Sequence, residues 1–376
     1  MSTVRTSEFE TLEPAIDPNN RITFLLDWEL TMKCNLDCSY CMSDLYGGHD
    51  NTTKHPPFAE CVTAIDFMFR YADLYMQTKP KGIKYVVMNV YGGESLHHPD
   101  IVEILSQARQ RYTPYIDRWH LTVTTTTNAI ISNKKLQRII PFIDEFTVSY
   151  HAQNTVKHHA QFKENLLIIA QSGKRQKYIV MMDPGHFETC DNMIIWLQDN
   201  NIKYIPKQLD SSKTYDNSQI KWFDKVYKEK TFGKSIEVLD HTKSELQLSD
   251  VGRACCGGRQ MCVDQNHKQR QVYVENKFPD WYCSVNHFFL YIKQVTGEVF
   301  VNKDCKMNFD GQVGSIGTLN NPDEILQKLE SHILNDDMPV IQCKKYNCLC
   351  GLCAPKAKSL GTYRSIMKKY QRQRNL

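Results

Sequence analysis

The sequence predicts an α/β protein with six strand–helix units around a parallel sheet, followed by a small cysteine-rich C-terminal domain. Short β-branched runs alternate with longer helical patterns as far as Gln208, the arrangement that builds βα units. Beyond Gln208 the alternation stops, and cysteine and glycine organise the remainder of the chain. The 376 residues, 41% of them hydrophobic, are enough to bury one large or two ordinary cores.

Six strands and five intervening helices account for the first part of the chain. Runs such as residues 85–88 are apolar without strict alternation, which suits strands covered by helices. The expected strands are Thr23–Thr31, Lys84–Val90, Trp119–Thr126, Glu145–Tyr150, Lys177–Met182 and Lys203–Gln208. The expected helices are Phe58–Tyr75, Pro99–Tyr112, Asn133–Ile140, Thr155–Ser172 and Phe187–Asn200.

These patterns divide the chain into five parts. We expect a polar arm over residues 1–22, the βα region over 23–209, a polar linker over 210–254, the cysteine-rich domain over 255–355 and a basic tail over 356–376. The tail contains seven Lys or Arg residues and no acid. Such a run is typical of a solvated terminal helix or a disordered tail, and less often of a contact with phosphate backbones.

Charge and hydropathy exclude several classes of protein. The 46 Lys and Arg against 42 Asp and Glu give a net charge of +4, too small to indicate a nucleic-acid-coating protein. No apolar stretch approaches the roughly 20 residues that span a bilayer. Glu8, Glu10, Glu13 and Asp17 stand where a signal peptide needs an apolar run. We therefore expect a soluble, cytoplasmic protein with no membrane partner.

Cysteine is the unusual feature of the composition. Fourteen cysteines in a chain without an export signal favour metal or cluster ligation over disulfides, because the cytosol keeps thiols reduced. Three of them lie close together early in the chain, and nine fall between Cys255 and Cys353. Cys61 and Cys190 each lie inside a predicted amphipathic helix, where we expect a small buried apolar residue.

The early cysteines, Cys34, Cys38 and Cys41, directly follow the first predicted strand. Their thiolates therefore converge at the carboxyl edge of the sheet, where barrel active sites lie. Three thiolates can hold three irons of a four-iron four-sulfur (4Fe-4S) cluster and leave one iron open. The alternative is a zinc site, with His49 or His55 as the fourth ligand.

The CxxxCxxC spacing, with Tyr40 before the last cysteine, resembles the signature of the radical S-adenosylmethionine (SAM) superfamily. This resemblance implies a partial (βα)6 TIM-like barrel, a SAM-binding 4Fe-4S cluster on Cys34, Cys38 and Cys41, and SAM chelated at the open iron. One electron from the cluster would cleave SAM to methionine and a 5′-deoxyadenosyl radical, which takes hydrogen from the substrate.

Further motifs continue the resemblance after the second strand. Gly92, Gly93 and Glu94 match the family's GGE motif, whose backbone and acidic group contact the amino group of SAM. The low potentials that 4Fe-4S clusters reach are consistent with SAM reduction. The resemblance thus implies that Tyr40 and the GGE residues belong to the SAM site.

The ends of the third and fourth strands give two more matches. Asn128, in Thr126–Ala129, is similar to the family's TNG-like turn near the SAM ribose, and Ser149 stands where relatives place a polar ribose contact. Alternatively, both residues cap the helices that follow. Many relatives carry an arginine for the SAM carboxylate on the next helix, but residues 157–161 contain none, so this contact is unassigned.

The C-terminal cysteines resemble those of SPASM and twitch extensions, which hold auxiliary iron–sulfur clusters. The final group reads C-x4-C-x-C-x2-C, which is not the usual SPASM order, so the ligand pairing is open. The alternative is a zinc ribbon. We expect one or two auxiliary 4Fe-4S clusters, the first on Cys283, Cys305, Cys350 and Cys353 and the second on Cys256, Cys262, Cys343 and Cys348.

The resemblance implies an enzyme that oxidises a peptide or protein. Alternatives are a radical SAM dehydrogenase or remodelling enzyme acting on a small molecule, nucleoside or nucleic acid and, more distantly, a non-catalytic iron–sulfur or zinc protein. Expected partners are SAM, the substrate and an electron donor such as flavodoxin or ferredoxin. Residues 1–22 are too short for a leader-peptide-binding domain, so we expect any such domain on a separate chain.

Overall fold

A computed structural model describes most of the chain. The described residues are 8–14, 22–41, 50–77, 84–209, 215–229, 260–272, 278–303, 306, 308–309, 312–335, 337–343 and 354–373. Of the expected metal ligands, Cys256, Cys305, Cys348, Cys350 and Cys353 lie outside the described residues, and so does His49.

Six parallel strands in chain order form one end of a nine-stranded sheet, with β7 at its edge. They match the six predicted strands to within a few residues. They are β2 (Ile22–Thr31), β3 (Lys84–Gly92), β4 (His120–Thr127), β5 (Glu145–His151), β6 (Arg175–Met182) and β7 (Tyr204–Gln208). The predicted α/β class with a parallel sheet is thus confirmed, while its partial-barrel form and a separate cysteine-rich domain stay predictions.

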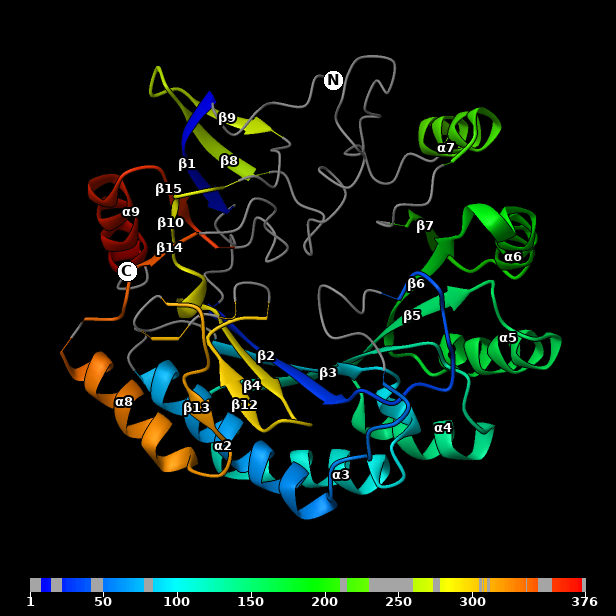
Figure 1. Ribbon diagram of the computed structural model, residues 1–376, viewed down its shortest axis with the longest axis horizontal. Coiled ribbons are helices and arrows are strands. Elements are labelled where there is room, and N and C mark those ends of the chain that lie inside the picture. Colours follow the sequence, from blue (N-terminus) through cyan, green and yellow to red (C-terminus); the bar gives the residue numbers. More distant parts are fainter. Residues whose placement is uncertain are drawn as a thin grey trace.

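Helices line one side of this curving sheet (Figure 1). The five predicted helices are present, and a further helix, α7, lies within the region expected to be a linker. The helices are α2 (Phe58–Gln77), α3 (Ile101–Tyr112), α4 (Asn133–Ile139), α5 (Val156–Gln171), α6 (Phe187–Asp199) and α7 (Asn217–Glu229). Short 3-10 turns, including η2 (Ser95–His97), η3 (Thr113–Tyr115), η4 (Ile140–Phe142) and η5 (Pro184–His186), connect several of these elements.

The two faces of the sheet differ in chemistry because successive strand residues point to opposite sides. On the helix side, apolar residues such as Phe24 and Trp28 of β2 are fully buried, and the Phe24 ring lies 5.9 Å from that of Tyr71 on α2. On the other side, Asn89 Nδ2 donates to Asp27 Oδ1 (3.0 Å), and Thr124 Oγ1 donates to Asn89 Oδ1 (3.1 Å). This polar row crosses β2, β3 and β4, so the face opposite the helices presents hydrogen-bonding groups.

C-terminal strands extend the same sheet. β11 (Phe289–Lys293) pairs in parallel with β2, and β12 (Glu298–Phe300) and β13 (Gly317–Thr318) follow in antiparallel pairing. The helix α8 (Pro322–Leu334) packs near α2, where Asp323 pairs with Arg70 at 2.8 Å. The sequence patterns did not predict that the C-terminal region would join the βα sheet.

A second sheet joins the two ends of the chain. It contains, in spatial order, β14 (Ile341–Gln342), β10 (Tyr282–Cys283), β15 (Lys356–Ala357), β1 (Phe9–Pro14), β8 (Gln260–Asp264) and β9 (Gln269–Val272). We expected no element in the polar arm, but Phe9 and Leu12 of β1 are buried there. In the basic tail, α9 (Leu360–Gln373) buries Tyr363 and Ile366, so this part of the tail packs on the fold.

Candidate functional site

The three early cysteines lie on the loop that directly follows β2. Cys34 and Cys38 are half-buried, Cys41 is exposed, and none of the three forms a disulfide. The Cys41 backbone N–H donates to Cys38 O (2.9 Å), which turns the loop back on itself. The carboxyl ends of β3, β4, β5 and β6 supply most of the neighbouring side chains described below.

The thiols of this loop influence one another electrostatically. Burial, with a smaller contribution from the neighbouring cysteines, raises the pKa of Cys34 to about 11 and that of Cys38 to about 12. Thiolates form on such a loop when a bound cation compensates their charge. Three free thiols are a donor set suited to iron, although no group of three His, Cys, Asp or Glu in the described part of the chain is arranged as a ready metal site.

Gly92 and Gly93 let the end of β3 approach the start of the cysteine loop. Gly93 N–H donates to Thr31 O and Glu94 N–H donates to Lys33 O, both at 2.7 Å. A Cβ on Gly92 would lie 2.0 Å from Thr31 O, and one on Gly93 would lie 2.3 Å from Lys33 O. Any side chain at either position would therefore push the cysteine loop away from β3.

The Glu94 carboxylate is buried and joins the ends of β3 and β4. Its Oε1 accepts from Thr127 Oγ1 (2.8 Å) and Leu96 N–H (3.0 Å), and its Oε2 accepts from Asn128 N–H (2.6 Å). Burial raises the pKa of Glu94 to about 7, although these hydrogen bonds lower it. Both oxygens of the predicted SAM contact thus already hold the turn that carries Asn128.

Asn128 lies against Cys34. Its Nδ2 is 2.8 Å from Asn35 Oδ1 and 3.8 Å from Cys34 Sγ, and its Oδ1 accepts from Ile130 N–H (2.9 Å). Ser132, not Asn128, caps α4, so the alternative of a helix cap does not hold. Asn35 was not among the predicted site residues, and its position inside the cysteine motif was the available signal.

Ser149 lies within β5, on the strand face that is not packed against the helices. Thr155, not Ser149, caps α5, because its side chain accepts from His158 N–H. The helix-cap alternative thus fails here as well. Ser149 shares its face of the strand with His151, which brings both toward the loop edge.

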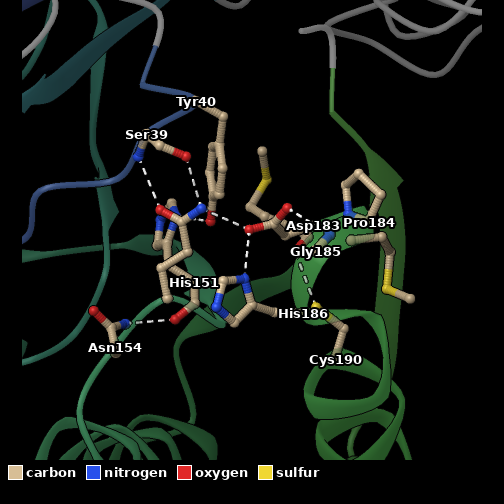
Figure 2. Close-up of polar contacts among 12 residues, drawn as sticks. Ser39, Tyr40, His151, Asn154, Asp183, Pro184, Gly185, His186 and Cys190 are labelled. Atoms are coloured by element: carbon tan, nitrogen blue, oxygen red, sulfur yellow. Dashed lines mark hydrogen bonds and ion pairs between the residues drawn. The ribbon is translucent and has the colours of Figure 1, made fainter. Parts of the chain in front are cut away.

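Tyr40 stacks on His151 at the end of β5. The two rings are 5.9 Å apart at 16°, and Tyr40 Oη lies 3.1 Å from His151 Nδ1 (Figure 2). Burial lowers the pKa of His151 to about 4, with a smaller contribution from Lys207. The imidazole is therefore neutral near pH 7, and its Nδ1 shares a hydrogen bond with the Tyr40 hydroxyl whose direction depends on the tautomer.

Gln153 and Asp183 form the remaining polar contacts of the loop. Gln153 bonds to both the backbone and the side chain of Ser39, and to Asp183 after β6 (Figure 2). Asp183 is fully buried and also bonds to His186 Nδ1 at 2.9 Å. Neither Gln153 nor Asp183 was among the predicted site residues, and their place directly after predicted strands was the available signal.

The other sequence candidates have partners outside the three cysteines. His55, the alternative zinc ligand, bonds through Nδ1 to Thr31 Oγ1 (3.0 Å) and contacts His98 edge-on. Cys61 and Cys190 are fully buried in α2 and α6, which confirms their expected apolar role.

No described helix is long and apolar enough to cross a membrane.

Three of the expected auxiliary ligands lie in or directly beside the second sheet. Cys283 ends β10 and Cys343 directly follows β14, the strand that pairs with β10; both are buried. The sequence predicts these two residues in different clusters, whereas the structure places them on one pair of strands. The ligand pairing stays open. Cys262 lies in β8 of the same sheet.

Comparisons with known proteins give similarity at a low level. No family model and no curated protein matches the chain. The solved structure "Native anSMEcpe with bound AdoMet" is 8% identical, with a TM-score of 0.49 over 94% of this chain and 98% of that chain. The same protein with AdoMet and the Cp18Cys peptide gives 9% identity and a TM-score of 0.47 over the same shares.

A 5-methylcytosine deaminase from Klebsiella pneumoniae, liganded with phosphonocytosine, gives a TM-score of 0.34. It is 12% identical over 59% of this chain and 53% of that chain.

Proposed function

We propose that this chain is a radical SAM enzyme that oxidises a peptide or protein. The observation that carries this proposal is the loop with Cys34, Cys38 and Cys41, which follows the first of the six parallel strands and contacts residues at the ends of the next three. Cys34, Cys38 and Cys41 would hold a 4Fe-4S cluster, which would supply the electron for reductive cleavage of SAM.

The chain's own residues position this site. Asn128 directs an amide N–H toward Cys34 Sγ, and a donor near a cluster thiolate stabilises its negative charge. Glu94 fixes the turn that carries Asn128, and Gly92 and Gly93 hold the loop close to β3. The neutral His151 orients the Tyr40 ring beside the loop.

Substrate would bind on the face of the sheet opposite the helices. That face presents the polar row of Asp27, Asn89 and Thr124, which suits a substrate with amide or hydroxyl groups. The SPASM-like cysteines support a peptide or protein substrate, since the resemblance associates them with such reactions. Auxiliary 4Fe-4S clusters in the C-terminal region and a flavodoxin or ferredoxin as electron donor belong to the same proposal.

The first test is formation of 5′-deoxyadenosine by anaerobically reconstituted protein given SAM and a strong reductant. We expect the parent to produce it and the triple variant C34A/C38A/C41A to produce none. Cys61→Ala, which removes a buried thiol on α2, is the matched control and should retain the activity. A parent loaded with iron that neither binds nor cleaves SAM would refute the proposal.

The second test addresses the substrate. The active protein is supplied with a peptide panel and, separately, with sugar and nucleoside panels, and the products are analysed by mass spectrometry. Loss of two hydrogens from a peptide would support the proposal. Turnover restricted to sugars or nucleosides would overturn the peptide assignment and favour a small-molecule enzyme.

A further inference from the structure

The Gln153 side chain bridges Ser39 of the cysteine loop and Asp183 of the turn after β6. Its Oε1 accepts from Ser39 N–H (2.8 Å). Its Nε2 donates to Ser39 Oγ (2.8 Å) and to Asp183 Oδ2 (2.6 Å). The carbonyl oxygen and both amide hydrogens of Gln153 therefore each have a partner.

Asp183 determines which way this amide points. The carboxylate is fully buried; its Oδ1 accepts from Gly185 N–H (3.1 Å), and its Oδ2 lies 2.9 Å from His186 Nδ1. An ionised carboxylate only accepts hydrogen bonds, so the Gln153 amide nitrogen must face Asp183. The amide oxygen then faces the Ser39 N–H, which only donates.

Ser39 stands between Cys38 and Tyr40, in the half of the loop that also carries Cys41. Its side chain is exposed, so apolar packing contributes little to its position. Cys34, in the other half, is held separately by Asn128 from β4 and by Asn51 at its backbone N–H. The two halves of the cysteine motif thus have different anchors.

We propose that Gln153 and Asp183 are positioning residues that set the placement of Cys38 and Cys41 relative to Cys34. The relevance of this placement to a cluster rests on the proposed function. Neither residue acts on the substrate in this proposal. They act through Ser39, and loss of their hydrogen bonds would loosen the Cys38–Cys41 half of the loop without releasing Cys34.

The test begins with the cluster-free protein and hydrogen–deuterium exchange at the Ser39 amide. Gln153→Glu places a second carboxylate against Asp183, and we expect exchange at Ser39 to become about tenfold faster, the effect of losing about one hydrogen bond. Adding Asp183→Asn restores a donor opposite the new carboxylate and should return the rate toward that of the parent. Gln153→Met, which removes the hydrogen bonds without adding charge, should also accelerate exchange.

Gln161→Glu is the control, since it makes the same chemical change on α5, where the side chain contacts Asn133 instead of the loop. It should leave Ser39 exchange unchanged. In reconstituted protein, Gln153→Glu should alter the electron paramagnetic resonance spectrum of the reduced cluster, and the double variant should restore it.

Unchanged Ser39 exchange in both Gln153 variants would overturn the proposal. Equal acceleration in Gln161→Glu, or a double variant no slower than Gln153→Glu, would also overturn it, because the effect would then be general destabilisation. The exchange measurement needs no cluster. A parent that fails to cleave SAM would thus refute the proposed function, but the exchange result would still test whether Gln153 and Asp183 position the loop.

Discussion

Gly93→Ala tests whether the cysteine loop depends on close contact with β3. The added Cβ would lie 2.3 Å from Lys33 O and 2.5 Å from Met32 O, and both are backbone atoms that cannot rotate away. The chains must separate until these contacts are relieved. This movement strains the Gly93–Thr31 and Glu94–Lys33 hydrogen bonds, each now 2.7 Å long.

Overpacking of this kind costs about 1–3 kcal/mol, and weakening the two hydrogen bonds adds about 1 kcal/mol each. We therefore expect Gly93→Ala to lower the free energy of unfolding by about 3–5 kcal/mol. Urea unfolding of the cluster-free protein measures this value. Iron content after reconstitution should fall as well, because the displaced segment leads directly into Cys34.

Gly361→Ala provides the matched control, since a Cβ at this position in α9 meets no atom within 4 Å. Alanine is favoured over glycine inside helices, so this variant should be unchanged or more stable by up to about 1 kcal/mol. If Gly93→Ala were as stable as the parent and bound the same amount of iron, the reasoning about close contact would be wrong.

Two further predictions concern the turn beside Cys34. The folded pKa of Glu94, about 7, lies above its ordinary value of 4.5, so its contribution to stability is fully present below pH 4.5 and is lost as the pH rises through 7. Relative to Glu94→Gln, the parent should lose stability on the order of 3 kcal/mol across this window in urea titrations at several pH values; parallel pH curves would contradict this. Ala129 adopts a left-handed φ of 55°, which favours glycine, so Ala129→Gly should cost about 1 kcal/mol less than Ala160→Gly in α5 by the same assay. Equal costs would show that the left-handed turn stores no strain.

The strand–helix units and the place of the cysteine loop were predictable because their signals are local. Hydrophobic runs marked β2 to β7, and the observed helices begin and end within a few residues of the predicted ones. Cys34, Cys38 and Cys41 lie in one short segment after a strand, so their convergence needed no tertiary information. The apolar role of Cys61 and Cys190 followed in the same way from helix periodicity.

The partners of these residues required the tertiary structure. Glu94 was predicted as a SAM contact, but its hydrogen bonds to Thr127 and Asn128 depend on the parallel pairing of β3 with β4. Gln153 bonds to Ser39 across 114 positions of the chain, and Asp183 bonds in turn to Gln153. No local sequence pattern predicts these hydrogen bonds, because they form only when the sheet brings the strand ends together.

Local sequence patterns predict the α/β class, the six strand–helix units and a cysteine motif that resembles the radical SAM signature. They do not predict that β11 extends the parallel sheet beside β2, or that β1 of the polar arm pairs with β15 of the basic tail. Periodicity and propensity act only over a few residues. Pairing between distant strands depends instead on which buried faces and unpaired backbone groups meet when the whole chain folds.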